Sequence, residues 1–331
     1  MKSRQSTDAP IKNYDNLIQH FLDRDKKALA RIITLAENDP EAARIILSKL
    51  CRHIHGAYIV GFTGTPGSGK STLISKLVTF LSEKGFKIGI ISVDPSSPYS
   101  QGAFLGDRVR MREIILDPNV FIRSVASRGR LGGLAKAVFD IAILYDAYGM
   151  DYILVETVGA GQSEVDIFRL AYTVILVTVP GLGDSVQVQK AGLLEIADIM
   201  VINKSDLGGD FLKINLNMML DSYTRQRSWR PPIIRTIATD GKGITELFQA
   251  IQEHREHLEL SNNLMMKKRA NIRYRLQSLI ESYLFERILE KLSITKKFDN
   301  LIEKILSGSQ DIYSAAHEIL QPLLKKVEKS L

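Results

Sequence analysis

Short apolar runs alternate with longer segments of helical periodicity between residues 56 and 260. Each run is apolar throughout, which is typical of strands buried on both faces of a parallel sheet. The expected strands are Ala57–Thr63, Lys87–Val93, Val120–Ser124, Tyr152–Glu156, Thr173–Val179, Ile199–Asn203 and Pro232–Ile237. The clearest expected helices between and after them are Ser71–Lys84, Val109–Leu116, Leu131–Tyr148 and Ile244–His257. The pattern predicts an α/β fold with a doubly wound, mainly parallel sheet.

Helical sequence without strand signals flanks this region on both sides. Residues 1–55 form the expected N-terminal helical extension, in which Asp39 and Pro40 suit the N-cap and first turn of a helix. Residues 261–331 form the expected C-terminal helical segment. Its apolar stripes have to be buried, either back on the sheet or against a second subunit. They comprise Ile272, Leu276, Leu279, Ile280, Tyr283, Leu284 and Ile288, and then Ile312, Ala316, Ile319, Leu320, Leu323 and Val327.

The junction of the first strand and the next helix has the spacing of a phosphate-binding loop. Backbone N–H groups of such a loop surround phosphate oxygens, and the helix N-terminus adds partial positive charge. Lys70 is expected to reach the β- and γ-phosphates, and the Ser71 hydroxyl to ligate Mg²⁺. The alternative is an ordinary glycine-rich turn, but strand, loop and helix follow in the right order for a P-loop. The loop runs through Gly64, Thr65, Pro66, Gly67, Ser68, Gly69, Lys70, Ser71 and Thr72.

A second motif, Asn203-Lys204-Ser205-Asp206, follows a buried strand at the edge where open α/β sheets bind ligands. The Asp206 carboxylate can accept from the ring N1–H and the exocyclic amine of guanine, whereas the unprotonated N1 of adenine would repel it. Asn203 can bond the other edge of the base or brace the loop, and the Lys204 stem can cover the base plane. The alternative is a polar loop with Asp206 as a helix cap. With the phosphate loop, the motif predicts GTP or GDP as the ligand.

Acidic residues at strand ends supply the expected metal site. Glu156 ends one strand and is suited to hold Mg²⁺ directly or through water, while Gly159 can approach the γ-phosphate. Asp94 and Asp107 are the other candidates for the Mg²⁺ shell. Gln162 follows Gly159, but its spacing differs from that of the water-positioning amide in small GTPases.

Composition limits the cellular compartment and the classes of binding partner that are expected. The chain of 331 residues is 45% hydrophobic and carries a net charge of +7, with basic and acidic residues mixed along it. The excess charge is therefore expected on solvated helix surfaces, and nucleic acid is not an expected partner. The single cysteine, Cys51, excludes an intrachain disulfide, and no apolar run approaches the length of a membrane span. With no apolar leader after Met1, we expect a cytoplasmic protein without a membrane partner.

Further blocks occur in a fixed order with these motifs: V-D-P-S-S-P at 93–98, L-G-D at 105–107, S-R-G-R-L-G-G at 127–133, E-T-V-G-A-G-Q-S-E at 156–164 and P-G-L-G-D at 180–184. With them the chain closely resembles the MeaB/ArgK-type GTPases associated with methylmalonyl-CoA mutase, from about Lys27 through Leu258. The resemblance implies a P-loop GTPase domain over residues 56–260, of the branch that also holds the metallochaperones. It also implies a homodimer through the C-terminal helices, and a chaperone whose GTP hydrolysis gates adenosylcobalamin loading of an acyl-CoA mutase and protects that enzyme.

Residue roles follow from the same resemblance. It makes Asp94, Asp107 and Glu156 the Mg²⁺ and switch acids, and it places a third switch at residues 181–190. Within this switch, Lys190 would stabilise the charge that develops in the transition state. The expected catalytic residues are therefore Lys70, Glu156 and Lys190. Ser185 stands where the family usually has an acidic residue, so a carboxylate contact at that position is in doubt.

Three other function classes remain open from the sequence. A P-loop kinase would need an acceptor site, and no separate substrate domain is visible. A metallochaperone would need metal ligands, but His254 and His257 lie among Glu253, Arg255 and Glu256, which favours a solvated helix face. A non-catalytic dimeric module would bind the nucleotide without hydrolysing it.

Overall fold

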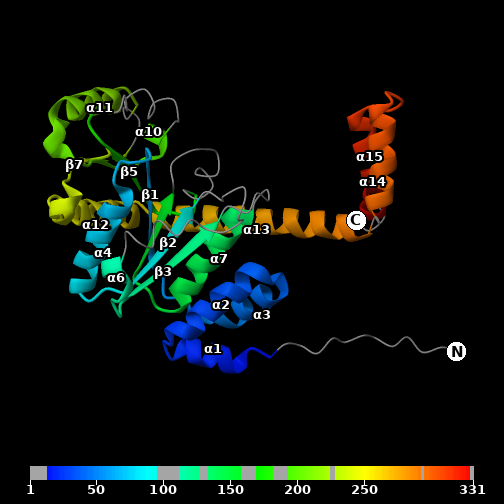
Figure 1. Ribbon diagram of the computed structural model, residues 1–331, viewed down its shortest axis with the longest axis horizontal. Helices are drawn as coiled ribbons and strands as arrows, with labels where there is room; N and C mark the ends of the chain where they lie inside the picture. The colour runs from blue at the N-terminus through cyan, green and yellow to red at the C-terminus, as the bar shows by residue number, and fades with distance from the viewer. Residues whose placement is uncertain are drawn as a thin grey trace. The chain divides into compact units, whose positions relative to one another are not determined.

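The computed structural model describes residues 13–94, 112–126, 133–157, 169–181, 193–223, 228–291 and 294–328 (Figure 1). The chain divides into two compact units, Met1–Arg275 and Leu276–Leu331. Their boundary falls inside the longest helix, α13 (Asn263–Lys291).

All the expected strands are present in the first unit, with ends shifted by no more than two residues. They form one sheet in the order β3-β2-β4-β1-β5-β6-β7, and every described pair is parallel. The strands are β1 (Tyr58–Gly64), β2 (Ile88–Asp94), β3 (Val120–Ala126), β4 (Tyr152–Thr157), β5 (Thr173–Thr178), β6 (Ile199–Ile202) and β7 (Ile233–Arg235). The predicted α/β class with a doubly wound parallel sheet is therefore confirmed.

Helices cover both faces of this sheet, which explains why the strands are apolar on both sides. One apolar cluster joins Phe62 and neighbouring strand residues to α4 (Lys70–Glu83) and α12 (Ile244–Leu260). Another joins Ile59 and Val155 to α7 (Gly133–Ala147). A third lies under α11 (Gly209–Tyr223), beside β5 and β6. Short elements complete this unit: η1 (Cys51–His53), α6 (Arg112–Ile115), α10 (Leu193–Ile196), η2 (Ser205–Leu207) and η3 (Ala238–Asp240).

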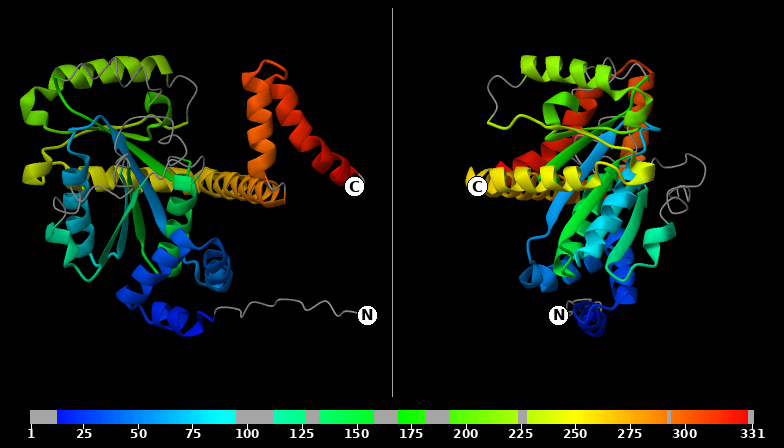
Figure 2. Two further views of the ribbon diagram at one scale, coloured as in Figure 1. Left: turned by 45° about the vertical axis from the view of Figure 1, so that its right-hand side comes forward. Right: turned by 90° about the vertical axis from the view of Figure 1, so that its left-hand side faces the viewer.

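The N-terminal extension consists of three helices, of which the second and third pack against α7 and the first packs against the second (Figure 2). They are α1 (Asp15–Leu22), α2 (Lys26–Asn38) and α3 (Pro40–Leu50). The Asp39 side chain accepts from the N–H groups of Glu41 and Ala42, so it caps α3 as expected. An ion pair between Glu37 and Arg123 joins α2 to β3, the strand at one edge of the sheet.

The chain after Ser261 is helical wherever it is described, as predicted. α14 (Ile294–Leu306) and α15 (Ile312–Glu328) follow α13 in the second unit and contact each other. Several members of the expected apolar stripes are exposed in this single chain: Ile272, Leu276, Ile280, Tyr283, Leu284, Ile312 and Leu320. Among the described residues, none of the helices combines the length and apolar character that a bilayer crossing requires.

Candidate nucleotide site

The predicted phosphate loop lies between the last residue of β1, Gly64, and the first residue of α4, Lys70. Because the described strands pair in parallel, the carboxyl ends of β1, β4 and β6 share one edge of the sheet. That edge is where open α/β sheets bind ligands. The phosphate loop, Glu156 and the Asn203–Asp206 motif therefore lie at the same edge of the sheet.

Two glycines of the loop combine a positive φ with a close neighbour that leaves no room for a side chain. Gly64 has φ 139°, and a Cβ there would lie 2.0 Å from the carbonyl oxygen of Val177. Gly69 has φ 85°, and a Cβ there would lie 2.4 Å from Nδ2 of Asn203. Any larger residue at either position would displace the loop, since both neighbours belong to adjoining parts of the site.

Side-chain donors gather around this loop. The Lys70 ammonium is buried and donates to the carbonyls of Gly64 at 2.7 Å and Thr65 at 3.1 Å. The buried hydroxyl oxygens of Thr63, Thr65 and Ser68 have no hydrogen-bond partner within the described part of the chain. Buried hydroxyls are normally bonded, so this cluster suits an external anion with many acceptor oxygens, such as a polyphosphate.

The two residues expected to hold Mg²⁺ are in direct contact. The Ser71 hydroxyl donates to Oε1 of Glu156 at 2.6 Å, and Glu156 is buried at the end of β4. A hydroxyl and a carboxylate are the oxygen donors that Mg²⁺ prefers, and both lie beside the phosphate loop. The donor set therefore fits a magnesium ion.

The base-reading motif is bonded to the phosphate loop. Asn203 Nδ2 donates to the Ser68 carbonyl at 2.9 Å, and Lys204 Nζ donates to the Gly67 carbonyl at 3.1 Å. Asn203 therefore braces the loop, which is one of the two roles open to it. Lys204 has φ 53°, a left-handed conformation that is uncommon and costly for a non-glycine residue. Asp206 is exposed in η2.

Residues after β7 belong to the same cluster, although they form part of no sequence motif described above. The Thr236 hydroxyl and the Ala238 N–H both donate to Oδ1 of Asn203, at 3.0 and 3.1 Å. The available signal was their position at the carboxyl end of the predicted strand Pro232–Ile237, because such positions lie at the ligand edge. They contribute by holding the amide of Asn203 in one orientation.

Other expected site residues fall outside the described ranges. These are Asp107, Gly159 and Lys190, together with Gln162. Asp94 is the last residue of β2, so its backbone lies at the carboxyl edge of the sheet. The described residues contain no group of three or more His, Cys, Asp or Glu side chains arranged to hold a metal ion.

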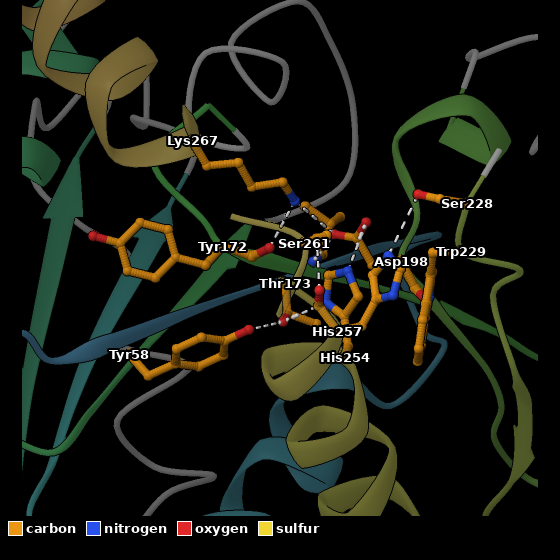
Figure 3. A network of polar contacts seen from close by, with 11 residues as sticks. Tyr58, Tyr172, Thr173, Asp198, Ser228, Trp229, His254, His257, Ser261 and Lys267 are labelled. Carbon is orange, nitrogen blue, oxygen red and sulfur yellow. Dashed lines mark hydrogen bonds and ion pairs between the residues drawn. The ribbon is translucent and has the colours of Figure 1, made fainter. Parts of the chain in front are cut away.

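The expectation of a solvated helix face is wrong for His254, which is 1% exposed. Its Nδ1 lies 2.9 Å from the Thr173 hydroxyl, and its Nε2 lies 3.4 Å from the Asp198 carboxylate (Figure 3). The Trp229 ring stands 4.9 Å from the His254 ring and 5.1 Å from that of His257. The sequence neighbours of His254 are charged and suggest an exposed position. The residues that bury it, such as Trp229, are distant in sequence and could not be recognised there.

Burial lowers the pKa of His254 from 6.5 to about 4, and this predicts a pH dependence of folding. The unfolded chain takes up a proton at this residue below pH 6.5, while the folded protein takes it up only below about pH 4. Stability is therefore full above pH 6.5 and declines between these values, by about 3 kcal/mol at roughly 1.4 kcal/mol per pKa unit.

Urea unfolding at a series of pH values tests this expectation. Replacing His254 with glutamine keeps an amide that can donate to Asp198 but removes the titration. The variant is expected to lose less stability than the wild type between pH 6.5 and 4. Parallel curves for the two proteins would contradict the prediction.

Comparisons with known proteins agree with this geometry. A family model described as methylmalonyl Co-A mutase-associated GTPase MeaB matches residues 29–293. A Pyrococcus abyssi protein named as a GTPase is 49% identical, over 94% of this chain and 97% of its own length. The mouse methylmalonic aciduria type A homolog, mitochondrial, is 32% identical, over 92% of this chain and 80% of its own.

The solved structure of an LAO/AO transport system kinase superposes with a TM-score of 0.66 at 24% identity. It covers 93% of this chain and 97% of that one. At this identity the likeness shows a shared fold.

Proposed function

The chain belongs to the MeaB family of methylmalonyl-CoA mutase-associated GTPases, and from this premise we propose that it is a GTP-driven chaperone of an adenosylcobalamin-dependent acyl-CoA mutase. Its own reaction is hydrolysis of GTP. The proposed consequence of that reaction is to gate cofactor loading of the mutase and to protect the loaded enzyme. Family membership and the described nucleotide site are the support for this function.

One contact carries the nucleotide part of the proposal. Asn203 Nδ2 bonds the Ser68 carbonyl, so the base reader and the phosphate loop form one connected unit. Asp206 then selects guanine by accepting from its two adjacent N–H groups, as derived above. Neither contact depends on the γ-phosphate, so both GTP and GDP are expected to bind.

Hydrolysis would be promoted by charged side chains and by a bound metal ion. Lys70 would neutralise charge on the β- and γ-phosphates, and Lys190 is proposed to stabilise the charge that develops in the transition state. Ser71 and Glu156 would hold Mg²⁺, which when bound supplies positive charge to the phosphate oxygens. Glu156 also orients the Ser71 hydroxyl by accepting a hydrogen bond from it.

A homodimer is also proposed, on the exposed apolar side chains of the C-terminal helices. Ile272, Leu276, Ile280 and Leu284 recur every four residues along α13 and are exposed in the single chain. Side chains of this size at helical spacing suit burial against a partner helix. A second copy of this chain is the partner that the family resemblance favours.

The direct test uses a purified adenosylcobalamin-dependent acyl-CoA mutase. Single-turnover hydrolysis of GTP is measured with and without this mutase, and ATP is run in parallel. We expect hydrolysis specific for GTP and accelerated about tenfold or more by the mutase, because partners commonly complete GTPase sites. Inactivation of the loaded mutase during turnover should also slow when this protein and GTP are present.

Two results would contradict parts of the proposal separately. Equal turnover of ATP and GTP would exclude the guanine switch. GTP hydrolysis that the mutase leaves unchanged, with no effect on loading or inactivation, would exclude the chaperone role while leaving the GTPase reaction intact.

A further inference from the structure

The helix α11, at the upper left margin of the first unit in Figure 1, is apolar on two opposite faces. Its inner face carries Leu212, Leu216 and Leu220, which are buried beside β5 and β6. On the outer face, Phe211 is 73% exposed and Ile214 is 53% exposed. These two residues are three positions apart and therefore lie on one side of the helix. A helix that only covers a sheet is polar on its outer face, so this outer face is suited to a further contact.

A third exposed apolar residue lies between α11 and the base-reading motif. Leu207, the last residue of η2, is 66% exposed and directly follows Asp206 in the chain. The Leu207 N–H donates to the carbonyl of Lys204 at 3.0 Å, and Lys204 Nζ donates to a carbonyl of the phosphate loop at 3.1 Å. Leu207, Phe211 and Ile214 are called the α11 patch. Described hydrogen bonds thus connect one end of this patch to the nucleotide site.

The acidic side chains of α11 are paired within the chain. Asp210 forms an ion pair with Arg235 at 2.6 Å, and Asp221 forms one with Arg230 at 2.7 Å. The other charged residue in the sequence of this helix is Lys213. Surfaces that bind nucleic acid or anionic membranes carry a clear excess of Lys and Arg, and α11 has no such excess. The chemistry of the α11 patch therefore suits an apolar surface of another protein.

The spacing and the size of the patch favour a helical partner that binds transiently. Apolar residues three and four positions apart, as at Phe211, Ile214 and the exposed Met218, form a seam on which one helix packs against another. A few large apolar side chains that are exposed by half or more provide about 400 Å². A stable dimer needs about 800 Å² from each copy. The patch alone is thus too small to hold a second copy permanently, and it suits a partner that binds and leaves.

We propose that the α11 patch is the docking site for an amphipathic helix on the surface of the client mutase. A client that responds to the nucleotide has to bind near the nucleotide site, and Leu207 adjoins Asp206 there. The homodimer proposed above draws on exposed side chains of α13, which are different residues from those of the patch. The inference rests on the proposed chaperone function for the identity of the partner, whereas its place on α11 is tested separately.

Polar substitutions in the patch test this docking site. Phe211→Gln and Ile214→Gln each change an exposed side chain, so Tm, GTP affinity and hydrolysis without mutase should equal those of the wild type. Each variant is expected to weaken binding of the purified mutase, measured with a non-hydrolysable GTP analogue, about tenfold. The mutase concentration that half-maximally accelerates GTP hydrolysis should rise by the same factor. Leu260→Gln is the matched control, because Leu260 is 90% exposed on α12, and this variant should bind the mutase normally.

Photo-crosslinking locates the contact without removing an apolar side chain. Replacing Phe211 with p-benzoylphenylalanine keeps an aromatic ring at the patch, and illumination with the mutase present should give a crosslinked product. Mass spectrometry of that product should place the crosslink on a helix of the mutase. The same residue in place of Leu260 should give no crosslink. A crosslink from position 260 alone would place the client elsewhere and overturn the inference.

The remaining outcomes separate the docking site from the chaperone function. If the wild type binds the mutase and both patch variants bind it equally well, the docking site is wrong and the chaperone function stands. If the wild type binds no mutase with either GDP or the GTP analogue, both proposals fail.

Two other occupants of the patch have their own measurements. Analytical ultracentrifugation of the patch variants would show a lost dimer if a second copy were the occupant. Sedimentation with vesicles of phosphatidylglycerol and phosphatidylcholine would show binding by the wild type, and not by the variants, if a lipid surface were the occupant. Either result would overturn the inference, and we expect neither.

Discussion

Replacing Lys70 with alanine is expected to weaken GTP binding about 100-fold or more and to reduce hydrolysis at saturating GTP about 1,000-fold. The Lys70 ammonium is buried within the loop, where its charge is poorly screened and its bonds to phosphate oxygens are strong. The loss in binding is expected to be larger for GTP than for GDP, because the ammonium reaches both the β- and γ-phosphates. Calorimetric titration with GDP and with a GTP analogue, followed by single-turnover kinetics, measures the three quantities.

The matched control is Lys76→Ala, which removes the same side chain from the same helix, away from the loop. This variant is expected to bind and hydrolyse GTP as the wild type does. Retention of wild-type affinity in Lys70→Ala would show that the loop from Gly64 to Thr72 does not hold the phosphates.

Replacing Asp206 with asparagine is expected to change the preferred base from guanine to xanthine. The carboxylate accepts from two N–H groups of guanine, whereas an asparagine amide offers one donor and one acceptor. Xanthine carries an oxygen where guanine has its exocyclic amine, so it matches the amide. GTP affinity should fall about 100-fold or more, and xanthosine triphosphate should become the better ligand, because each charge-assisted bond contributes about 1.5–3 kcal/mol.

Competition binding with GTP, ATP and xanthosine triphosphate measures this exchange. Asp210→Asn is the control, since Asp210 is exposed on α11 and pairs with Arg235 at 2.6 Å rather than with a base. Its nucleotide preference should be that of the wild type. An Asp206→Asn protein that still prefers GTP would remove Asp206 from base recognition.

The strands could be predicted from sequence because each is buried on both faces. A strand such as β4 has no polar position before Glu156, so its limits are visible as the limits of an apolar run. The same apolar runs also showed which motifs lie at the ends of strands. Once Gly64 and Asn203 were placed at strand ends, the parallel topology brought them to one edge of the sheet.

The rest depends on contacts between residues far apart in the chain. The bracing role of Asn203 depends on the position of Ser68, which lies 135 residues away in the chain. His254 has charged neighbours in sequence, but Trp229 and Thr173 enclose it. The contact that Asn271 makes could not be predicted for the same reason. Its amide donates to the backbone carbonyl of Leu170, and the sequence does not indicate which carbonyl a side chain reaches.

The order of the strands separates two tasks in space. β4, which ends in the Glu156 region, lies on one side of β1, while β6, which leads to Asn203 and Asp206, lies beyond β5 on the other. The acid beside the metal and the residues that choose the base thus belong to opposite halves of the sheet, joined by the loop after β1. Evolution, or a protein engineer, can alter the nucleotide preference of such an enzyme without rebuilding the part that sets its turnover.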